Sequence, residues 1–415
     1  MSIVALVFSV VLWVVGGYLL LNVVYLLLFA LAGHRRLAAL PSTTPAGAAR
    51  RMCVLLPAYQ ADGVVLETAP AAAAHAYAGV ADVHVIADGL LPATVLALRA
   101  QGVGVVEVAF VKSTKGQALL AALNALPAGR YDTAVILDVD NVMAPGFLTQ
   151  VDQAFGAGYR AVQGHRTAKN MDSAFAVLDA CNEEINNHLF RRGHVALGLS
   201  AGLIGSGMAF EYELLRHHLQ NIGQTSGEDK ELDFCLLRDG VKIAYLPEAY
   251  VLDEKVPNAQ VFTTQRTRWM AAQLEFLQKH LAEGPRQLLR GNVEFFDKVV
   301  QTLLLPRILL LGALGLGLLA TLLGWPWGPS AAYWALLLAG TGAALLLSLP
   351  GRLYNRQVGQ AVLHLPVALG AMLLALLQIG KAKHSFMATP HQPHAAGPAP
   401  SAPVASATQE TQTIT

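Results

Sequence analysis

The sequence predicts an α/β domain with a mostly parallel sheet, flanked by hydrophobic segments that are long enough to cross a membrane. Apolar residues make up 54% of the 415 residues but are unevenly distributed, because residues 3–32 contain no charged side chain. Between residues 34 and 301, short β-branched runs alternate with alanine-rich stretches. Uncharged runs of this length favour membrane helices, whereas the alternation favours parallel strands joined by crossover helices.

Residues 1–33 are predicted to form a transmembrane helix. About 20 apolar residues suffice to cross the hydrocarbon core, and this run is too long for the apolar part of a signal peptide. His34-Arg35-Arg36 follows it directly, and positive residues beside a span favour the cytoplasmic side. We therefore expect the domain that follows the linker of residues 34–50 to face the cytoplasm.

The charge pattern changes again after residue 301. Only six charged side chains lie beyond it, so residues 302–384 are predicted to form a membrane region of two or three helices. Spans at roughly 303–324 and 330–350 are separated by two tryptophans, two prolines and a glycine, which suit a turn at the membrane surface. The stretch 358–380 contains Pro366 and Gly370, so a third span and a re-entrant or interfacial segment both fit.

The remaining composition narrows the possible functions. The three cysteines are widely spaced, which argues against a disulfide framework or a zinc site and suits a reducing compartment. The net charge of +1 gives no reason to expect a nucleic acid partner. Residues 281–301 are expected to form an amphipathic helix at the membrane interface, and residues 385–415 a disordered tail rich in small residues and proline.

Within the expected soluble domain, residues 51–280, several polar side chains follow predicted strands. The strands are expected at 52–57, 83–87, 103–109 and 134–137, and helical stretches at 64–78, 92–100 and 116–126. In parallel sheets of this kind, ligands collect at the carboxyl ends of the strands. The polar residues at such ends are Tyr59, Asp88, Asp138 and Asp140.

Asp138 and Asp140 close one of these strands. Side-chain alternation places both carboxylates on the same side, about 6–7 Å apart along the strand. Such a pair can hold a hard divalent cation, which in turn neutralises a diphosphate. A surface turn is the alternative for so short a pattern, but unpaired carboxylates at the end of a buried strand are costly, which favours the metal site.

Asp88 and Lys115 are candidates for binding the nucleotide. Asp88 ends an apolar strand, where its carboxylate could accept hydrogen bonds from a base such as uracil; a cap on the following turn is the alternative. Lys115 precedes Gly116 in a turn before a helical stretch, where its ammonium suits a diphosphate. A solvated lysine fits that position as well.

Two later motifs place acidic and basic groups on helices. Glu228 and Asp229 open the helical stretch 229–239, so they could favour the helix N-terminus or supply a general base, Asp229. Gln265, Arg268 and Trp269 share one helical face by their spacing. Arginine and tryptophan there could hold a phosphate and stack on a sugar. Alternatively, Trp269 belongs to the core and the arginines lie at the membrane surface.

Taken in order, these motifs resemble the family-2 glycosyltransferases, the inverting, metal-dependent family of cellulose synthases, hyaluronan synthases and poly-N-acetylglucosamine synthases. The resemblance covers about residues 51–270, and the hydrophobic segments on both sides also fit that family. The matching stretches are Leu55-Leu-Pro57-Ala-Tyr59, Ala87-Asp88-Gly89, Lys115-Gly116, Asp138-Val-Asp140, Gly205-Ser-Gly207-Met208, Gly227-Glu228-Asp229 and Gln265-Arg-Thr-Arg268-Trp269.

The resemblance implies a GT-A fold and a role for each motif. It implies that Asp138 and Asp140 bind Mg²⁺ or Mn²⁺ and that Asp229 is the catalytic base. The residues expected at the nucleotide-sugar donor are Pro57, Tyr59, Asp88, Lys115 and Asp138. Those expected at the acceptor and the diphosphate are Glu228, Gln265, Arg268 and Trp269.

The sequence departs from the family pattern in three ways. Ala87 stands where the family usually has the first acid of an Asp-Asp pair, and Gly227 replaces the usual threonine before Glu-Asp. The number of expected spans is also small for a synthase that translocates a polymer. These departures leave processivity and secretion open.

The expected function is inverting transfer from a nucleotide sugar, with a UDP-sugar favoured, to a glycan acceptor. The β-linked product would belong to a cell-surface or extracellular polysaccharide made at the inner (plasma) membrane, with export proteins as possible partners. Single transfer to a polyprenyl phosphate or another lipid is the alternative within enzymes. From another class, a non-catalytic nucleotide-sugar receptor would not need Asp229. A transporter usually places ionisable groups within its spans, and these spans are almost free of them.

Overall fold

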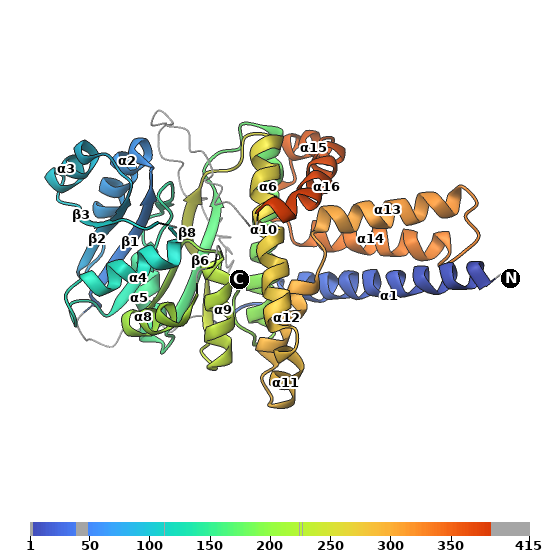
Figure 1. Ribbon diagram of the computed structural model, residues 1–415, viewed down its shortest axis with the longest axis horizontal. Helices are drawn as coiled ribbons and strands as arrows, with labels where there is room; N and C mark the ends of the chain where they lie inside the picture. Colours follow the sequence, from blue (N-terminus) through green and yellow to red (C-terminus); the bar gives the residue numbers. More distant parts are fainter. Residues whose placement is uncertain (1–2, 39–48, 112, 224, 226, 383–415) are drawn as a thin grey trace, which may run out of the picture.

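The computed structural model describes residues 3–38, 49–111, 113–223, 225 and 227–382. An α/β domain lies at one end of the molecule and a group of apolar helices at the other (Figure 1). Most of the expected linker and the whole of the expected disordered tail lie outside the described residues.

The α/β domain is built on an eight-stranded sheet in the order β3-β2-β1-β4-β7-β6-β8-β5. Strands β1 to β4 pair in parallel with one another, as do β6 and β8, whereas β7 and β5 pair antiparallel with their neighbours. The mostly parallel α/β sheet is therefore confirmed. The strand bounds are β1 Met52–Tyr59, β2 Ala81–Asp88, β3 Gly104–Val108, β4 Thr133–Ile136, β5 Val142–Met143, β6 Ala161–Ala168, β7 Met208–Glu211 and β8 Ile243–Asp253.

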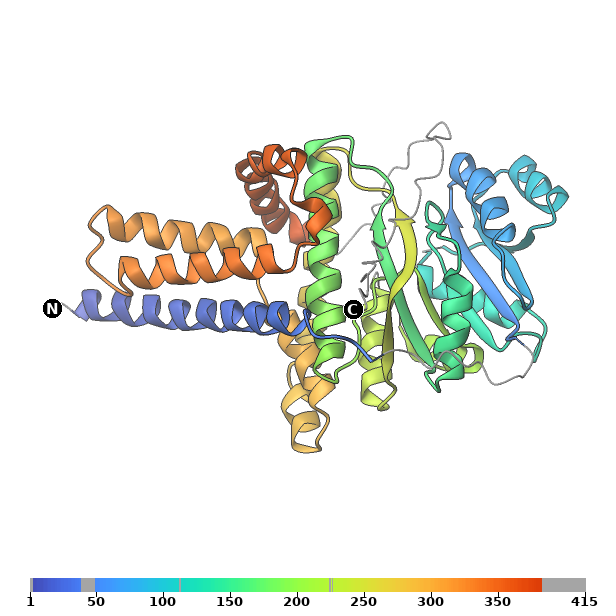
Figure 2. The same ribbon diagram turned by 180° about the vertical axis from the view of Figure 1, so that it is seen from behind.

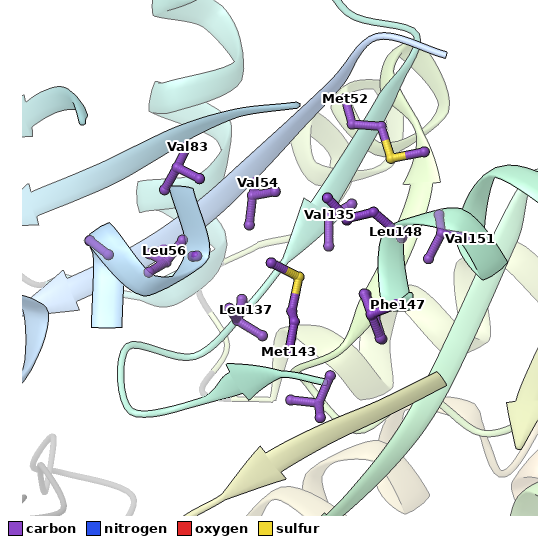
Figure 3. Packing of buried hydrophobic residues seen from close by; sticks show 14 of the residues in the cluster. Met52, Val54, Leu56, Val83, Val135, Leu137, Met143, Phe147, Leu148 and Val151 are labelled. Carbon is purple, nitrogen blue, oxygen red and sulfur yellow. The ribbon is translucent and has the colours of Figure 1, made fainter. Parts of the chain in front are cut away.

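Helices cover both faces of the sheet, which explains why β1 is a continuous apolar run. Alternate residues of β1 point to opposite faces, so Val54 and Leu56 belong to one core cluster and Cys53 and Leu55 to another. Figure 3 shows Val54 of the first cluster near Val135 of β4. The first face is covered by α2 Asp62–Ala73, α3 Pro92–Ala100 and α5 Phe147–Gly156, and the second by α4 Lys115–Ala125, α8 Tyr212–Asn221 and α9 Glu228–Arg238.

Two long helical segments stand between the sheet and the apolar helices (Figure 2). One is α6, Ala174–Asn187, which continues through a π-helical turn at His188–Gly193 into the short α7, His194–Ala196. The other is α10, Ala259–His280, which is followed by α11, Glu283–Leu289, and α12, Val293–Leu303. The segment expected as one interfacial helix, 281–301, is therefore two helices with a turn between them.

Three apolar helices lie side by side at the far end of the molecule (Figures 1 and 2). They are α1 Ile3–Ala32, α13 Arg307–Leu322 and α14 Ala331–Leu347. Their contact is a buried apolar cluster that includes Leu26, Leu310 and Trp334. The last helices are α15 Arg356–Val362 and α16 Leu365–Ala382. Helix α16 packs against α10 through Ala368 and Met372, and the start of α13 contacts the same cluster through Ile308.

Length limits what these helices can span. Among the described residues only α1 is long and apolar enough to cross a membrane by itself. The count rises to at most three if α12 with α13, bent by 57°, and α15 with α16, bent by 50°, each form one broken span. The spans expected at 303–324 and 330–350 are realised as helices of 16 and 17 residues, shorter than the roughly 20 residues that a straight span needs.

Candidate active site

The carboxyl ends of the sheet open into a cavity of about 1070 Å³ that reaches from β1 and β2 to α6, α9, α10 and the start of α13. All eleven residues predicted for the site line this cavity, although they come from six separate stretches of the sequence. The structure thus brings the predicted set together, and the role of each member stays a prediction. The lining residues in question are Pro57, Tyr59, Asp88, Lys115, Asp138, Asp140, Glu228, Asp229, Gln265, Arg268 and Trp269.

One end of the cavity is formed by the ends of β1 and β2. Asp88 is 8% exposed, and its Oδ2 accepts no hydrogen bond from any described residue. A buried acceptor without a donor is costly unless a ligand supplies one. The turn after Asp88 needs Gly89, whose φ is +69°. This end of the cavity can therefore take a planar N–H group such as that of a nucleobase.

Lys115 is fixed among acidic groups and is not a solvated lysine. It begins α4 after Thr114, whose hydroxyl accepts a hydrogen bond from Gln117 N. The Lys115 ammonium lies 2.5 Å from Asp138 Oδ1 and 3.7 Å from Glu228 Oε1. Burial lowers the pKa of Lys115, but Asp138 and Glu228 outweigh it, so the net shift of the pKa is upward.

The loop before β7 comes close to these groups. Lys115 also donates to the carbonyl of Gly205 at 2.6 Å, and Ser206 Oγ accepts from Asp138 N at 2.9 Å. Gly205 has a φ of +85°, and a Cβ there would lie 3.6 Å from Lys115 Nζ and 3.8 Å from Asp229 Oδ2. These distances are ordinary van der Waals contacts, but the positive φ would strain any other residue at this position. The glycine-rich match at residues 205–207 thus has a structural reason.

The surroundings of Asp140 disfavour the ionised form of its carboxyl group. Burial raises the pKa of Asp140 to about 8, with further upward contributions from Asp253 and Asp138. Asn141 links two of these acids, because its Nδ2 donates to Asp140 Oδ1 at 3.1 Å and to Asp253 Oδ1 at 2.8 Å. The sequence analysis missed Asp253. The sequence pattern that could have predicted it is an acidic residue at the end of a strand. Asp253 ends β8 in this way, and Asp140 follows β4.

Asp253 is held ionised by a buried network behind the strand ends. Lys255 Nζ lies 2.7 Å from Asp253 Oδ2 and 3.2 Å from Glu183 Oε2, and Arg166 Nη2 donates to the same Glu183 oxygen at 2.9 Å. Burial raises the pKa of Asp253, but Lys255 and Arg166 outweigh it and the net shift is downward. Asp253 therefore keeps its negative charge beside Asp140.

These carboxylates fit a metal that needs few protein ligands. The described residues contain no group of three or more acidic, histidine or cysteine side chains placed to hold an ion by themselves. Magnesium is usually bound by one or two carboxylates and completes its shell with water and substrate phosphates. A divalent cation would also relieve the repulsion that raises the pKa of Asp140. The donor set is consistent with a cation that binds together with a diphosphate.

The two acids at the start of α9 differ in environment. Burial raises the pKa of Glu228 to about 7; Lys115 opposes this shift and Asp229 adds to it. The Asp229 side chain is 19% exposed and its Oδ2 lies 4.0 Å from Lys230 Nζ. Asp229 is thus the more accessible acid. Glycine precedes them because a Cβ on Gly227 would lie only 2.9 Å from Phe276 of α10, which accounts for the departure from threonine.

Helix α10 supplies the opposite wall. Burial lowers the pKa of Arg268, although Glu228 and Asp138 act in the opposite direction, so this guanidinium lies towards the acids. Gln265 Oε1 is buried and accepts no hydrogen bond from any described residue. Trp269 is 41% exposed, so the alternative that placed it in the core is wrong.

Trp269 has a neighbour that the sequence analysis did not assign. The guanidinium of Arg266 lies 4.0 Å from the centre of the Trp269 ring and is paired with Asp179 of α6. Arginine over an aromatic face is a favourable arrangement. One face of Trp269 is therefore covered by the protein itself.

Known proteins provide an independent comparison. The model of the family described as "Glycosyltransferase like family 2" matches residues 49–272, which include all eleven predicted site residues. No curated protein matches the chain.

Solved structures add a comparison of folds. The mannosyltransferase PcManGT from Pyrobaculum calidifontis, in complex with GDP-Man and Mn²⁺, is 17% identical, with 91% of this chain and 99% of that chain covered and a TM-score of 0.57. Glucosyl-3-phosphoglycerate synthase from Mycobacterium tuberculosis, in complex with Mn²⁺, UDP and glucosyl-3-phosphoglycerate, is 21% identical over 53% of this chain and 78% of that chain, with a TM-score of only 0.38.

At 17% identity, the first of these structures supports a GT-A-like fold and carries no information about individual residues. The family model, by contrast, covers more than half of the chain and the entire predicted site. The chain belongs to glycosyltransferase family 2.

Proposed function

We propose that this glycosyltransferase transfers a sugar from a nucleoside-diphosphate sugar, with inversion, to a hydroxyl of a glycan acceptor. The observation that carries the proposal is the arrangement of the cavity. Carboxylates at the strand ends suit a cation and a diphosphate, and the accessible acid Asp229 lies in the same cavity beside them.

The donor lies along the strand ends in this proposal. Asp88 Oδ2 accepts an N–H of the base, which supplies its missing hydrogen bond. Lys115 and Arg268 flank the diphosphate, because both lie near Asp138. Mg²⁺ or Mn²⁺, held by Asp138 and Asp140, would stabilise the charge on the departing diphosphate. A UDP-sugar stays the favoured donor, and the PcManGT complex supports testing GDP-sugars beside it.

Asp229 is the catalytic base of the proposed reaction. The acceptor oxygen forms a bond to the anomeric carbon while the bond from that carbon to the diphosphate oxygen breaks. Asp229 takes the proton of the acceptor hydroxyl, and the nucleoside diphosphate leaves with the electron pair. One displacement inverts the configuration, so an α-linked donor gives a β-linked product.

The active site is proposed to face the cytoplasm, with α1 anchoring the chain in the inner membrane. The length of α1 and the basic residues after it support this arrangement. A cysteine introduced in the linker of residues 34–50 should resist an impermeant thiol reagent in intact cells and react after lysis. Labelling of intact cells would contradict the cytoplasmic assignment.

The test of the function is a donor panel. The full-length protein in membranes is incubated with labelled UDP- and GDP-sugars, with Mg²⁺, with Mn²⁺, and with a chelator. We expect release of nucleoside diphosphate and labelled product with one class of donor, and only in the presence of a divalent cation. Donor binding without any turnover would favour a receptor, and full activity in excess chelator would rule out the metal.

A further inference from the structure

The cavity changes character at the end that faces the apolar helices. There its walls come from α6, α10, α16, the sheet-side part of α1 and the segment that joins α12 to α13. Aliphatic and aromatic side chains replace the carboxylates of the strand ends. They are Leu26, Leu178, Phe190, Leu305, Ile308 and Met372.

Two arginines in this part of the cavity have no acidic partner among the described residues. Arg191 is 3% exposed; its Nε donates to Gly202 O and its Nη1 to Asn187 Oδ1, both at 3.0 Å. Arg307 donates through Nη2 to Asn186 Oδ1 at 2.8 Å and to Asn182. All of these hydrogen-bond partners are neutral. Glu183 acts electrostatically on both arginines, but it forms its ion pairs with Lys255 and Arg166.

Three other basic groups of the cavity behave differently. Lys255 and Arg166 form ion pairs with Glu183, and Arg266 forms one with Asp179. The Nη1 of Arg307 is also buried and donates no hydrogen bond to any described residue. Buried charge without a counter-ion is costly, and arginine binds phosphate through paired N–H groups. An anion bound in the cavity could therefore serve as the counter-ion of the two arginines.

Arg307 lies at the junction between the polar domain and the apolar helices. Arg307 is the first residue of α13, at the end where the three apolar helices meet α6 and α10 (Figures 1 and 2). The segment before it is held against α1, because Asn22 Oδ1 accepts from Leu305 N at 2.9 Å. The start of an apolar helix next to a polar domain corresponds to the level of lipid headgroups.

The cavity does not continue through the helix bundle. The lining residues from apolar helices are confined to one end of each helix, such as Asn22 and Leu26 of α1 and Arg307 and Ile308 of α13. No residue of α14 lines it, and the bundle has its own packed core around Trp334. The described residues thus form no lined passage for a polymer across the bundle.

We propose that the acceptor is carried on a membrane lipid whose headgroup contains a phosphate. This inference rests on the proposed function, since it names the acceptor of the same site. The phosphate binds between Arg191 and Arg307, the lipid chain lies against the apolar wall, and the acceptor hydroxyl beyond the phosphate reaches Asp229. The transfer step is the displacement described above, and the phosphate is not consumed.

Binding to simple probes tests the anion site directly. The full-length protein in phosphatidylcholine nanodiscs is titrated with dodecyl phosphate, dodecanol and inorganic phosphate. We expect dodecyl phosphate to bind at least about tenfold more tightly than either of the others, because it alone carries both the anion and the chain. Equal binding of dodecyl phosphate and dodecanol would overturn the anion site, and equal binding of dodecyl phosphate and inorganic phosphate would overturn the lipid assignment.

Substitutions test whether the two arginines bind the phosphate group of dodecyl phosphate. Arg307→Gln and Arg191→Gln should each weaken dodecyl phosphate binding about tenfold or more, because a charge-assisted hydrogen bond is lost. Arg307→Lys keeps the charge and should retain part of the affinity. Arg290→Gln, at an exposed arginine after α11 that does not line the cavity, is the matched control. A glutamine variant that does not fold is recognised by its loss of nucleotide-sugar binding. In that case, the lysine variant and the three probes still test whether the arginines bind the phosphate.

The transfer reaction separates failure of this inference from failure of the proposed function. Lipids from the source membranes are divided by anion exchange into phosphate-bearing and neutral fractions and offered beside water-soluble oligosaccharides. We expect labelled product with the phosphate-bearing fraction, and a raised KM for that fraction in Arg307→Gln. Product from a soluble glycan or neutral lipid alone overturns the lipid phosphate but keeps the transferase. Loss of metal-dependent donor binding and of nucleotide release would instead contradict the proposed function.

Discussion

The two ends of the cavity bury ionisable groups of opposite sign in different surroundings. At the strand ends, Asp140 is pressed against Asp253 and Asp138, and its pKa rises to about 8. At the end that faces the apolar helices, Arg191 and Arg307 form no ion pair in the described part of the chain. In our two proposals, the first end of the cavity binds a cation and the second end binds an anion.

Between these ends the charges are paired and serve to position the site. Lys255 joins Asp253 to Glu183, and Glu183 in turn joins Arg166. Buried ion pairs of this kind contribute little net stability but hold their members in place. The comparison therefore predicts large functional effects at the two ends and smaller effects where charges are already balanced.

The largest loss of turnover is expected from a substitution at Asp140. Asp140→Ala should reduce turnover to background and weaken metal-dependent donor binding, because half of the proposed metal-binding pair is lost. Asp132→Ala is the matched control, since Asp132 lies just before the opposite end of the same strand, exposed and paired with Arg51. Initial rates and donor titrations with Mn²⁺ measure both variants. Activity of Asp140→Ala within a few-fold of the wild type would remove Asp140 from the metal site.

A substitution at Asp229 is expected to lower the rate of transfer without lowering donor affinity. Asp229→Asn keeps the shape but removes the base, and a positioned base contributes about 10²–10⁴-fold in rate. The variant should bind the nucleotide sugar nearly as well as the wild type but transfer at least about a hundredfold more slowly. Asp239→Asn, at the exposed opposite end of α9, is the control. Lost donor binding with a normal rate at saturation would make Asp229 a donor ligand and turn attention to Glu228.

The pKa of Asp140 predicts how metal binding depends on pH. The carboxyl is protonated below about pH 8 and must lose its proton to bind a cation. The Mn²⁺ affinity of the donor-free protein should therefore rise with pH, by up to about tenfold per unit between pH 6 and 7.5, and level off above 8. Calorimetric titrations across this range measure the slope. An affinity that is flat from pH 6 to 8.5 would show that Asp140 is already ionised.

A substitution at Asp253 tests whether this carboxylate, which was not predicted from the sequence, contributes to metal affinity. Asp253→Asn removes the charge beside Asp140 while keeping an oxygen within reach of Asn141. We expect metal affinity to fall about 10–100-fold, as for other groups that support a metal ligand, and the pKa of Asp140 to fall as well. Glu248→Gln, at an exposed residue of the same strand, should leave both unchanged. Wild-type metal affinity in Asp253→Asn would show that Asp253 is purely structural.

The smallest effect is expected outside the cavity, at the ion pair of Arg238 and Glu283. Hydrogen bonding from Arg238 lowers the pKa of Glu283 to about 2. A lowered carboxyl pKa stabilises the fold above the ordinary pKa, and this contribution is lost as the pH falls from about 4.5 towards 2. Both side chains are about one-third exposed, so Glu283→Gln should cost no more than about 1 kcal/mol at pH 7. Thermal unfolding in detergent at pH 7 and pH 4 measures the difference, which should shrink at the lower pH.

The half of the sheet with continuous apolar strands could be predicted from the sequence. Strands β1, β2 and β4 are buried on both faces, so each reads as a short apolar run, and the acids that follow them mark the ligand edge. The resemblance then linked Asp229 and Trp269 to that edge. Local pattern and motif order were therefore sufficient to name eleven residues that the fold brings to one cavity.

The other half of the sheet could be known only from the tertiary structure. Strand β6, Ala161–Ala168, contains Gln163, His165 and Arg166, and β5 has only two residues, so neither shows a clear periodicity. Their places depend on pairing with β8, which lies about 80–110 residues further along the chain.

Contacts between distant segments also determine the surroundings of the charged groups. The pairing of β5 with β8 brings Asp253 near Asp140, and the packing of α13 against α6 gives Arg307 neutral hydrogen-bond partners. In the sequence, Asp253 and Arg307 are a strand-end acid and an arginine before an apolar run. Whether a charge is paired depends on which distant segments pack against it, and a local pattern does not carry that information.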